Sequence, residues 1–315
     1  MPTETSRAAA GVIHDLGYRR YDGPRFGRSR IVAALAWHSF RSAFGLGRGA
    51  KAKIVPVIAF VALLLPAVVN AFAMSQGNAR QVDYDTYVPA LRDLIMLVFV
   101  AVQAPELVSR DLRSRVLPLY FSRPIKPVDY PLAKYLGFTG ACLVMLEVPL
   151  LALYGGAVAN VHGGSAVWAE TKALIPGLLI GLLWAVTLAA VSLFLASMTG
   201  RRGFATGTVA IGFLLTYTLA EILLQVESPA LGHSAGPPGS GAAPAVAVPL
   251  AEKVAGLFSP FTLLQGVRLW LGGTNPGDNV PKPGAFGAVY ALVLIALVAL
   301  SLYGLAARYR KARLS

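Results

Sequence analysis

Long runs of apolar residues constrain this chain more than any other feature of its sequence. A helix needs about 20 mostly apolar residues to cross a hydrocarbon core about 30 Å thick, whereas a strand of a membrane barrel needs only about ten. The clearest run, residues 54–74, contains twenty-one residues without a charge. The sequence predicts an all-α polytopic membrane protein in which residues 1–315 form one transmembrane domain. Its six spans are expected at about 54–74, 87–109, 135–158, 173–198, 204–226 and 288–307.

The second span is the least regular of the six. Its uninterrupted apolar core, residues 94–105, is twelve residues long, and Arg92 and Asp93 precede it. A core of that length alone is typical of a re-entrant or buried segment. The segments before the first span and after the second are both basic, so both are expected on the cytoplasmic side, which requires an even number of crossings between them. We therefore interpret residues 87–109 as a span with a polar outer end.

The distribution of basic residues supports this topology. The chain is 56% hydrophobic and only 14% charged, against roughly 25% charged for a soluble domain. The net charge of +13 does not gather on one soluble domain but falls between the apolar runs, so no nucleic-acid partner is expected. The predicted cytoplasmic segments hold 22 of the 28 lysines and arginines: ten in residues 1–53, six in 105–136, two in 201–202 and four after 307. Both termini are therefore expected in the cytoplasm.

Two amphipathic segments lie outside the spans. Within the cytoplasmic segment 1–53, residues 30–44 predict a helix on the cytoplasmic leaflet, with a soluble amphipathic helix as the alternative. The apolar face of this helix consists of Val32, Ala36, Phe40 and Phe44, joined by Ala33 and Trp37. Within the outer segment 227–287, residues 250–271 predict two short helices interrupted by a Ser-Pro pair. These either dip into the outer leaflet or form an amphipathic cap on the outer surface.

The longest charged stretch inside the apolar sequence is residues 105–136, most of which forms a predicted cytoplasmic loop, 110–134. Six basic residues lie there among three acidic ones. Residues 110–121 predict a short amphipathic helix, because the two X-Pro steps that follow disfavour further helix. Such a helix suits contact with a soluble partner at the membrane surface. A solvated loop whose arginines only set the topology is the alternative interpretation.

Signals for catalysis are missing from the sequence. The closest approach to a phosphate-binding loop, residues 45–51, lacks the GxxxxGK[ST] spacing and follows no predicted strand. The four histidines are far apart, and the single cysteine, Cys142, excludes a multi-cysteine metal site. No GxSxG or HExxH sequence occurs. We therefore expect no catalytic residue, no metal ligand and no bound cofactor in this chain.

Ionisable residues inside the predicted spans are the remaining candidates for a transport site. Glu147 lies near the middle of the third span, Glu221 toward the outer end of the fifth, and Arg92–Asp93 near the outer end of the second. An ionisable group at membrane depth is costly and usually faces a cavity or a partner. Glu147 and Glu221 are therefore candidates for a substrate path. The alternatives are a structural hydrogen bond or salt bridge for Glu147 and contact with the membrane interface for Glu221.

One further pattern surrounds the basic loop: an acid–base pair after the second span, a short helix, a proline, then a tyrosine and a lysine leading into the third span. The residues that carry it are Arg110-Asp111-Leu112-Arg113, Leu117-Pro118-Leu119, Ser122-Arg123-Pro124, Tyr130 and Lys134. With this pattern the chain resembles permease subunits of ABC transporters of the ABC-2 type. The GYRRYDGPR segment at residues 17–25 also resembles bacterial members, whereas Ser114-Arg115 replaces the Gly-Thr-like pair of many members. The layout of the spans agrees over nearly the whole chain.

This resemblance implies a permease subunit of an ATP-driven transporter in the bacterial cell membrane. A separate ATPase subunit would bind ATP and dock on residues 110–121, which would act as a coupling helix. The coupling residues implied are Arg110, Asp111, Arg113, Arg115, Leu117, Arg123 and Pro124. A second permease chain, identical or similar, would complete a homodimer or heterodimer among the membrane lipids.

The low charge of the spans favours an amphipathic or hydrophobic substrate. Export is the direction of transport expected for this permease subunit. Two hypotheses from other classes remain open. The chain would be a proton-coupled secondary transporter with Glu147 as the carrier, or a membrane scaffold subunit that transports nothing. Dependence of transport on a separate ATPase distinguishes the first interpretation from both alternatives.

Overall fold

The computed structural model describes residues 23, 27–78, 80–87, 89–113, 125–227, 250–273 and 283–314. All regular elements in these ranges are helices: α1 (Arg28–Ala43), α2 (Lys51–Ser75), α3 (Pro89–Arg113), α5 (Asp129–Asn160), α6 (Gly164–Ser197), α7 (Arg202–Glu227), α8 (Leu250–Ala255), α9 (Pro260–Trp270), the 3-10 turn η1 (Gly284–Phe286) and α10 (Gly287–Leu314). Five helices, α2, α5, α6, α7 and α10, are long and apolar enough to cross a membrane. The structure thus agrees with the predicted class, an all-α chain with helices able to span a membrane, although five rather than six described helices meet that criterion.

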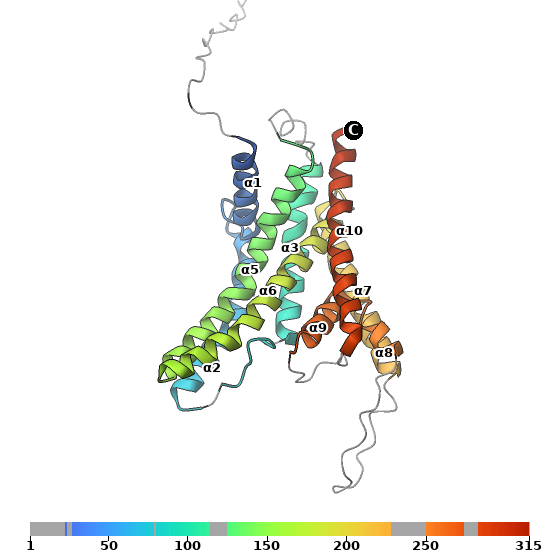
Figure 1. Ribbon diagram of the computed structural model, residues 1–315. Coiled ribbons are helices and arrows are strands. Elements are labelled where there is room, and N and C mark those ends of the chain that lie inside the picture. The colour runs from blue at the N-terminus through green and yellow to red at the C-terminus, as the bar shows by residue number, and fades with distance from the viewer. Residues whose placement is uncertain are drawn as a thin grey trace, which may run out of the picture.

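α3 differs from the other long helices because it is charged toward both ends and buried in the middle. Arg92 and Asp93 lie in its first turns and Glu106 lies two turns before its end. Five of its central residues are completely buried: Met96, Phe99, Val100, Ala104 and Val108. In Figure 1, α3 runs through the inside of the bundle, where it packs against α2, α6 and α7. Neighbouring helices therefore cover most of the surface of α3.

Glycines allow neighbouring helices to approach closely at two contacts along α5. A side chain at Gly137 would overlap the carbonyl oxygen of Ala36 in α1. A side chain at Gly156 would overlap the Cβ atom of Ala71 in α2. Small residues at such positions bring helix backbones together. α5 therefore has α1 against its first part and α2 against its last part.

α1 uses much of its predicted apolar face to pack on α5, alongside which it lies in Figure 1. Ser39 and Ala43 of α1 are buried, and Ser39 and Phe40 lie against Gly137 and Gly140 of α5. Trp37 remains 61% exposed and stacks on Phe40 with ring centroids 5.3 Å apart. Only the exposed side of α1, which includes Trp37, is left for contact with lipid.

The helix ends fall into two groups at opposite ends of the bundle (Figure 1). α1, the end of α3, the start of α5 and the end of α10 lie at one end, called the inner end below. The turn between α6 and α7 lies there too, because Arg308 donates hydrogen bonds to the carbonyl oxygens of Ser197 (3.2 Å) and Met198 (2.7 Å). α8, α9 and the segment between α2 and α3 lie at the opposite, outer end. The described parts of the segments predicted to be cytoplasmic therefore all lie at the inner end.

Several helices extend beyond the predicted bounds: α5 begins at Asp129 and α10 ends at Leu314. α6 begins at Gly164, well before the predicted span 173–198, because polar residues before the apolar run continue the helix. α3 continues to Arg113, so the first residues of the predicted 110–121 helix extend α3. The remainder of that predicted helix, residues 114–121, lies outside the described residues.

The outer segment contains the two short helices α8 and α9, separated at residues 256–259. The side chain of Ser259 accepts a hydrogen bond from the backbone N–H of Phe261 (3.3 Å), and Pro260 occupies the first position of α9. A serine cap followed by a proline is a favoured start for a helix, since the serine accepts from one of the unpaired backbone donors and the proline has no donor of its own. The Ser-Pro pair therefore begins α9.

Candidate functional site

Three residues of the ABC-2-like pattern contact one another at the inner end. Asp111, near the end of α3, accepts a hydrogen bond from the Tyr130 hydroxyl (2.7 Å) and pairs with the Lys134 ammonium group (2.8 Å). Tyr130 and Lys134 lie in the first two turns of α5 and are 1% and 7% exposed. The Lys134 ammonium also lies 5.4 Å from the centre of the Tyr130 ring. This group, called the inner anchor below, joins the two ends of the basic loop.

Side-chain contacts connect the start of α5 to two further helices. The ring of Tyr130 packs on that of Tyr309 in α10, with centroids 5.5 Å apart. The neighbouring Asp129 accepts hydrogen bonds of 2.6 and 2.5 Å from the guanidinium group of Arg28 in α1. Asp129 also accepts one of 2.8 Å from the backbone N–H of Lys126. The inner anchor is thus surrounded by contacts with α1 and α10.

The predicted coupling residues are only partly described. Asp111 belongs to the inner anchor. Arg110 and Arg113 lie in the last turn of α3, where their backbone alone is described. Four others lie outside the described residues: Arg115, Leu117, Arg123 and Pro124. Their role in coupling stays a prediction.

A second ion-pair group at the inner end was not anticipated from the sequence. Glu106 of α3 pairs with Arg48, in the turn before α2, and with Arg202, at the start of α7. Arg48 also donates a hydrogen bond to the carbonyl oxygen of Ser42 (2.6 Å). Glu106 therefore connects three elements that are far apart in the sequence. No periodicity or short motif relates these positions, so sequence reasoning had no signal for the contact.

Glu147, the first candidate for a substrate path, lies between α5 and α6. A side chain at Gly181 of α6 would overlap its Oε1 atom, so the carboxylate lies directly against the backbone of α6. Its Oε2 atom is buried and has no hydrogen-bond partner in the part of the chain that the structure describes. Gly181 also lines a cavity of about 20 Å³, together with Arg92 and Trp184, which is room for a single water molecule. Among the described residues, the Oε2 atom of Glu147 therefore has no hydrogen-bond partner, and the carboxylate lies against a glycine that borders a small cavity.

The predicted Arg92–Asp93 pair belongs to a larger group at the outer end. The Arg92 guanidinium lies 3.0 Å from the Asp93 carboxylate, and the Arg268 guanidinium of α9 lies 3.1 Å from that of Asp85. Arg268 also interacts electrostatically with both Arg92 and Asp93. These four residues are called the outer charge cluster below. Asp85 and Arg268 were not singled out in the sequence, because 183 positions separate them.

Burial distinguishes the outer charge cluster from ion pairs at a protein surface. Arg92 is 7% exposed and Arg268 is 4% exposed. Burial lowers the pKa of Arg268 below its usual value, and the charge of Asp85 opposes this change. Glu221, the second candidate for a substrate path, lies next to the cluster, since Tyr217 interacts with both Glu221 and Asp93. The structure therefore brings Glu221 near the outer charge cluster and leaves Glu147 outside it.

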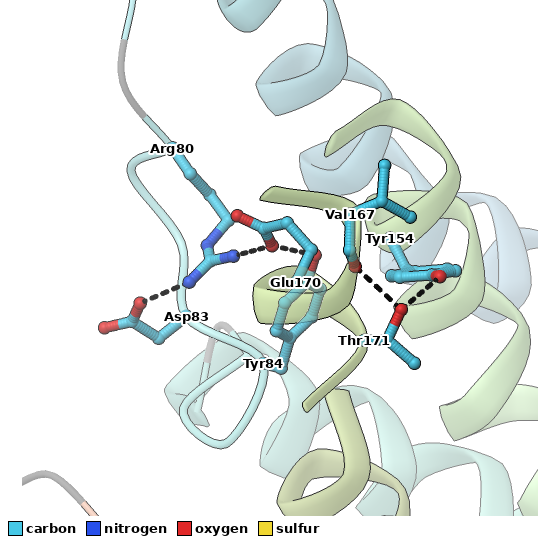
Figure 2. Close-up of polar contacts among 7 residues, drawn as sticks. All are labelled: Arg80, Asp83, Tyr84, Tyr154, Val167, Glu170 and Thr171. Atoms are coloured by element: carbon cyan, nitrogen blue, oxygen red, sulfur yellow. Dashed lines mark hydrogen bonds and ion pairs between the residues drawn. The ribbon is translucent and has the colours of Figure 1, made fainter. Parts of the chain in front are cut away.

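A separate polar group fastens the segment between α2 and α3 to α6. Figure 2 shows Glu170 of α6 accepting hydrogen bonds from Arg80 and from the Tyr84 hydroxyl, the latter at 2.8 Å. Arg80 also pairs with Asp83 (3.3 Å) and lies 4.4 Å from the centre of the Tyr84 ring. Burial, reinforced by the hydrogen bond to Glu170, raises the pKa of Tyr84 well above its usual value, so its hydroxyl remains a donor. This group explains why α6 extends beyond the apolar run, because Glu170 lies in the added turns.

Within the described ranges, no three His, Cys, Asp or Glu side chains gather in a way that would hold a metal ion. Among the described residues, ion pairs form at the two ends of the bundle, and the buried Oε2 atom of Glu147, between α5 and α6, has no hydrogen-bond partner. No family model matches the chain, and no curated protein matches it significantly.

Proposed function

We propose that this chain is the membrane-spanning permease subunit of an ABC transporter of the ABC-2 type. The observation that carries the proposal is the inner anchor. Asp111 and Tyr130, two residues of the family-like pattern that are 19 positions apart, are in direct hydrogen-bond contact, and Lys134 pairs with the same carboxylate. Residues of the pattern thus contact one another and connect the two helices, α3 and α5, that flank the basic loop. Such a contact is expected where a partner subunit exerts force on the loop.

The contacts around the inner anchor offer a route for that force. Asp111 lies at the end of α3 and Tyr130 at the start of α5, so movement of the loop would displace both helices. Tyr130 would pass the displacement to α10 through Tyr309, and Asp129 would pass it to α1 through Arg28. An ATPase docked on the loop would thereby act on four helices at once. This arrangement supports the assignment of residues 110–121 as the coupling segment.

The proposed topology has six spans, with α3 as the second. α3 has 25 residues and is therefore about 37 Å long, enough to cross a hydrocarbon core of about 30 Å. Its charged ends are compatible with this assignment because neighbouring helices cover most of α3. Both termini and α1 would lie on the cytoplasmic side of the bacterial cell membrane, as the clustering of basic residues at the inner end favours. α8 and α9 would lie at the outer leaflet.

Because the sequence contains no phosphate-binding loop, ATP binding and transport would be carried out by different subunits. A separate ATPase subunit would bind and hydrolyse ATP. A second permease chain, identical or similar, would complete the transporter. The substrate would be amphipathic or hydrophobic, in keeping with spans that contain few charges, and export would be the direction of transport.

The proposal is tested by co-purification of the tagged chain with a candidate ATPase subunit, read out as bound ATPase and as stimulated ATP hydrolysis. The triple variant Asp111→Ala/Arg113→Ala/Arg115→Ala is expected to lose both. Because Asp111→Ala also removes the inner anchor, the double variant Arg113→Ala/Arg115→Ala serves to change the loop surface alone. Arg80→Ala, which breaks an ion pair at the outer end, is the matched control and should retain the ATPase. If no ATPase binds even the unaltered chain, the proposal fails and a scaffold or secondary transporter remains.

Proton-coupled transport through Glu147 is a second candidate function, favoured by one observation. The Oε2 atom of Glu147 is buried without a hydrogen-bond partner among the described residues. A buried carboxylate oxygen that no described residue stabilises by a hydrogen bond suits a site that takes up and releases a proton. Transport into vesicles driven by a pH gradient, without ATP, is the result expected from this candidate. Transport that requires ATP and is indifferent to the gradient would exclude it.

A further inference from the structure

α9 presents two large side chains on one face to the inside of the bundle. Phe261 and Arg268 are seven residues apart, which places them on the same side of a helix. They are 3% and 4% exposed. The other side of α9 packs on α10, where a side chain at Gly266 would overlap the ring of Tyr290. α9 is therefore held against α10 and inserts an aromatic and a cationic group toward α3, α6 and α7.

Phe261 occupies a cage of three aromatic rings. Its ring centroid lies 5.4 Å from that of Trp184 in α6, 5.6 Å from that of Phe213 and 6.0 Å from that of Tyr217, both in α7. These distances and tilted geometries are typical of favourable aromatic contacts. The cage would accept an aromatic ring from any source that enters at the same position.

Arg268 occupies the acidic part of the outer charge cluster. Its guanidinium lies 3.1 Å from Asp85 and interacts electrostatically with Asp93. Without Arg268, the cluster would contain the two carboxylates and only one cation, Arg92. Removing a cation from a buried ion pair is costly, so another cation at this position is favoured when α9 is elsewhere.

The aromatic cage and the acidic site are continuous. Trp184 borders both, because the Arg92 guanidinium lies 4.3 Å from the centre of its ring while Phe261 packs against it. Tyr217 also borders both, since it contacts Phe261 and interacts with Asp93. Aromatic faces next to a carboxylate are the usual surroundings of a bound organic cation.

We propose that Trp184, Phe213 and Tyr217 together with Asp85 and Asp93 form a binding site for an aromatic organic cation, and that α9 fills this site with its own Phe261 and Arg268. The proposal deepens the proposed function, on which it rests, by naming the chemical class of the substrate. α9 would close the outer end when the site is empty of substrate. A substrate that carries both a ring and a positive charge would compete with α9 for the same contacts.

The test is binding of ethidium, an aromatic cation, to the purified chain without any ATPase, measured by fluorescence anisotropy. If α9 occupies the site about nine-tenths of the time, freeing the site raises the apparent affinity about tenfold. Arg268→Gln and Phe261→Ala are therefore expected to increase ethidium binding. Asp93→Asn is expected to decrease ethidium binding, both alone and combined with Arg268→Gln. If Arg268 and Asp93 had a purely structural role, Arg268→Gln and Asp93→Asn would instead change ethidium binding in the same direction.

Two controls test whether the effect depends on the positive charge of the ligand and on the position of the substitution. Arg80→Ala breaks another ion pair at the outer end and should leave ethidium binding unchanged. Anilinonaphthalene sulfonate, an aromatic anion, should not bind more tightly to Arg268→Gln. The proposal is overturned if Arg268→Gln binds ethidium no better than the unaltered chain while remaining folded by thermal unfolding. It is also overturned if Asp93→Asn binds ethidium as well as the unaltered chain. Because this assay contains no ATPase, absence of ethidium binding would not contradict the permease proposal. Conversely, ethidium could still bind if no ATPase associates with the chain, so the two proposals can fail separately.

Discussion

Arg48 and Glu106, 58 positions apart, form an ion pair whose side chains are only 19% and 6% exposed. The same carboxylate pairs with Arg202, whose side chain is 66% exposed. One glutamate at the inner end thus has a largely buried partner and a largely solvated partner. The difference in burial predicts a difference in energetic importance.

Arg48→Ala is expected to destabilise the protein much more than Arg202→Ala. Removing the buried partner leaves the Glu106 carboxylate poorly compensated, which costs about 3 kcal/mol. Removing the exposed partner costs less than about 1 kcal/mol, because solvent already screens that pair. Thermal unfolding of the purified variants compares the two directly. Equal loss of stability in the two variants would contradict burial as the cause of the difference.

Adjacent glycines in α5 provide a second, closely matched comparison. A Cβ atom at Gly156 would overlap that of Ala71 in α2, whereas a Cβ atom at Gly155 would meet no described atom within 4 Å. Gly156→Ala is expected to force α2 and α5 apart at a cost of about 1–3 kcal/mol. Gly155→Ala is expected to be neutral or to stabilise the helix by up to about 1 kcal/mol, because alanine favours helix. Unfolding measurements that rank the two variants in the opposite order would contradict the packing of α2 on α5.

The helices themselves could be predicted because the apolar runs that specify them are local. Residues 54–74, 204–226 and 288–307 each lie within an observed helix, at α2, α7 and α10. The start of α6 could not be predicted from hydropathy, since Glu170 lies in its polar first turns and contacts Arg80 and Tyr84 across the bundle end. For the same reason α1 was expected against lipid, although much of its apolar face packs on α5.

The residues of the candidate sites also differ in whether the sequence could identify them. The sequence singled out Asp111, Tyr130 and Lys134 because their spacing follows a family-like pattern, and the structure brings them into contact. It singled out Arg92 and Asp93 because charges are rare in apolar runs. It offered no signal for Asp85 and Arg268, whose contact depends on how α9 folds back over the bundle. Long-range ion pairs of this kind become visible only in three dimensions.

Tyr84 offers a test that depends on pH. Burial and the hydrogen bond to Glu170 raise its pKa in the folded protein above the ordinary value of 10.0. Tyr84→Phe is therefore expected to cost about 1 kcal/mol at pH 7, where the hydrogen bond is present. Above pH 10 the unfolded chain ionises Tyr84 while the folded chain keeps it protonated, so the contribution of Tyr84 to stability declines as pH rises. The gap in melting temperature between the two proteins should narrow between pH 7 and pH 11, and a constant gap would contradict this assignment.

Glu106 has ion-pair partners among the described residues, whereas the Oε2 atom of Glu147 has no hydrogen-bond partner there, and this difference predicts opposite responses to the same substitution. Glu106→Gln removes the charge that compensates Arg48 and is expected to lower stability by about 2–3 kcal/mol. Glu147→Gln removes the charge of a carboxylate whose Oε2 atom has no hydrogen-bond partner among the described residues. Its melting temperature is therefore expected to equal or exceed that of the unaltered chain, because a neutral amide is easier to bury than a carboxylate.

The Glu147→Gln variant also separates the two candidate functions. If the chain is an ATP-driven permease, the folded variant should still transport when its ATPase subunit and ATP are present, since Glu147 lies far from the inner anchor along α5. If Glu147 carries a proton, the same variant should fold normally and lose all transport driven by a pH gradient. Transport by the reconstituted variant, measured with ATP and with a pH gradient in turn, gives the two outcomes. A variant that unfolds as readily as Glu106→Gln would show instead that Glu147 has a structural partner, and that the hypothesis of an unpartnered carboxylate is wrong.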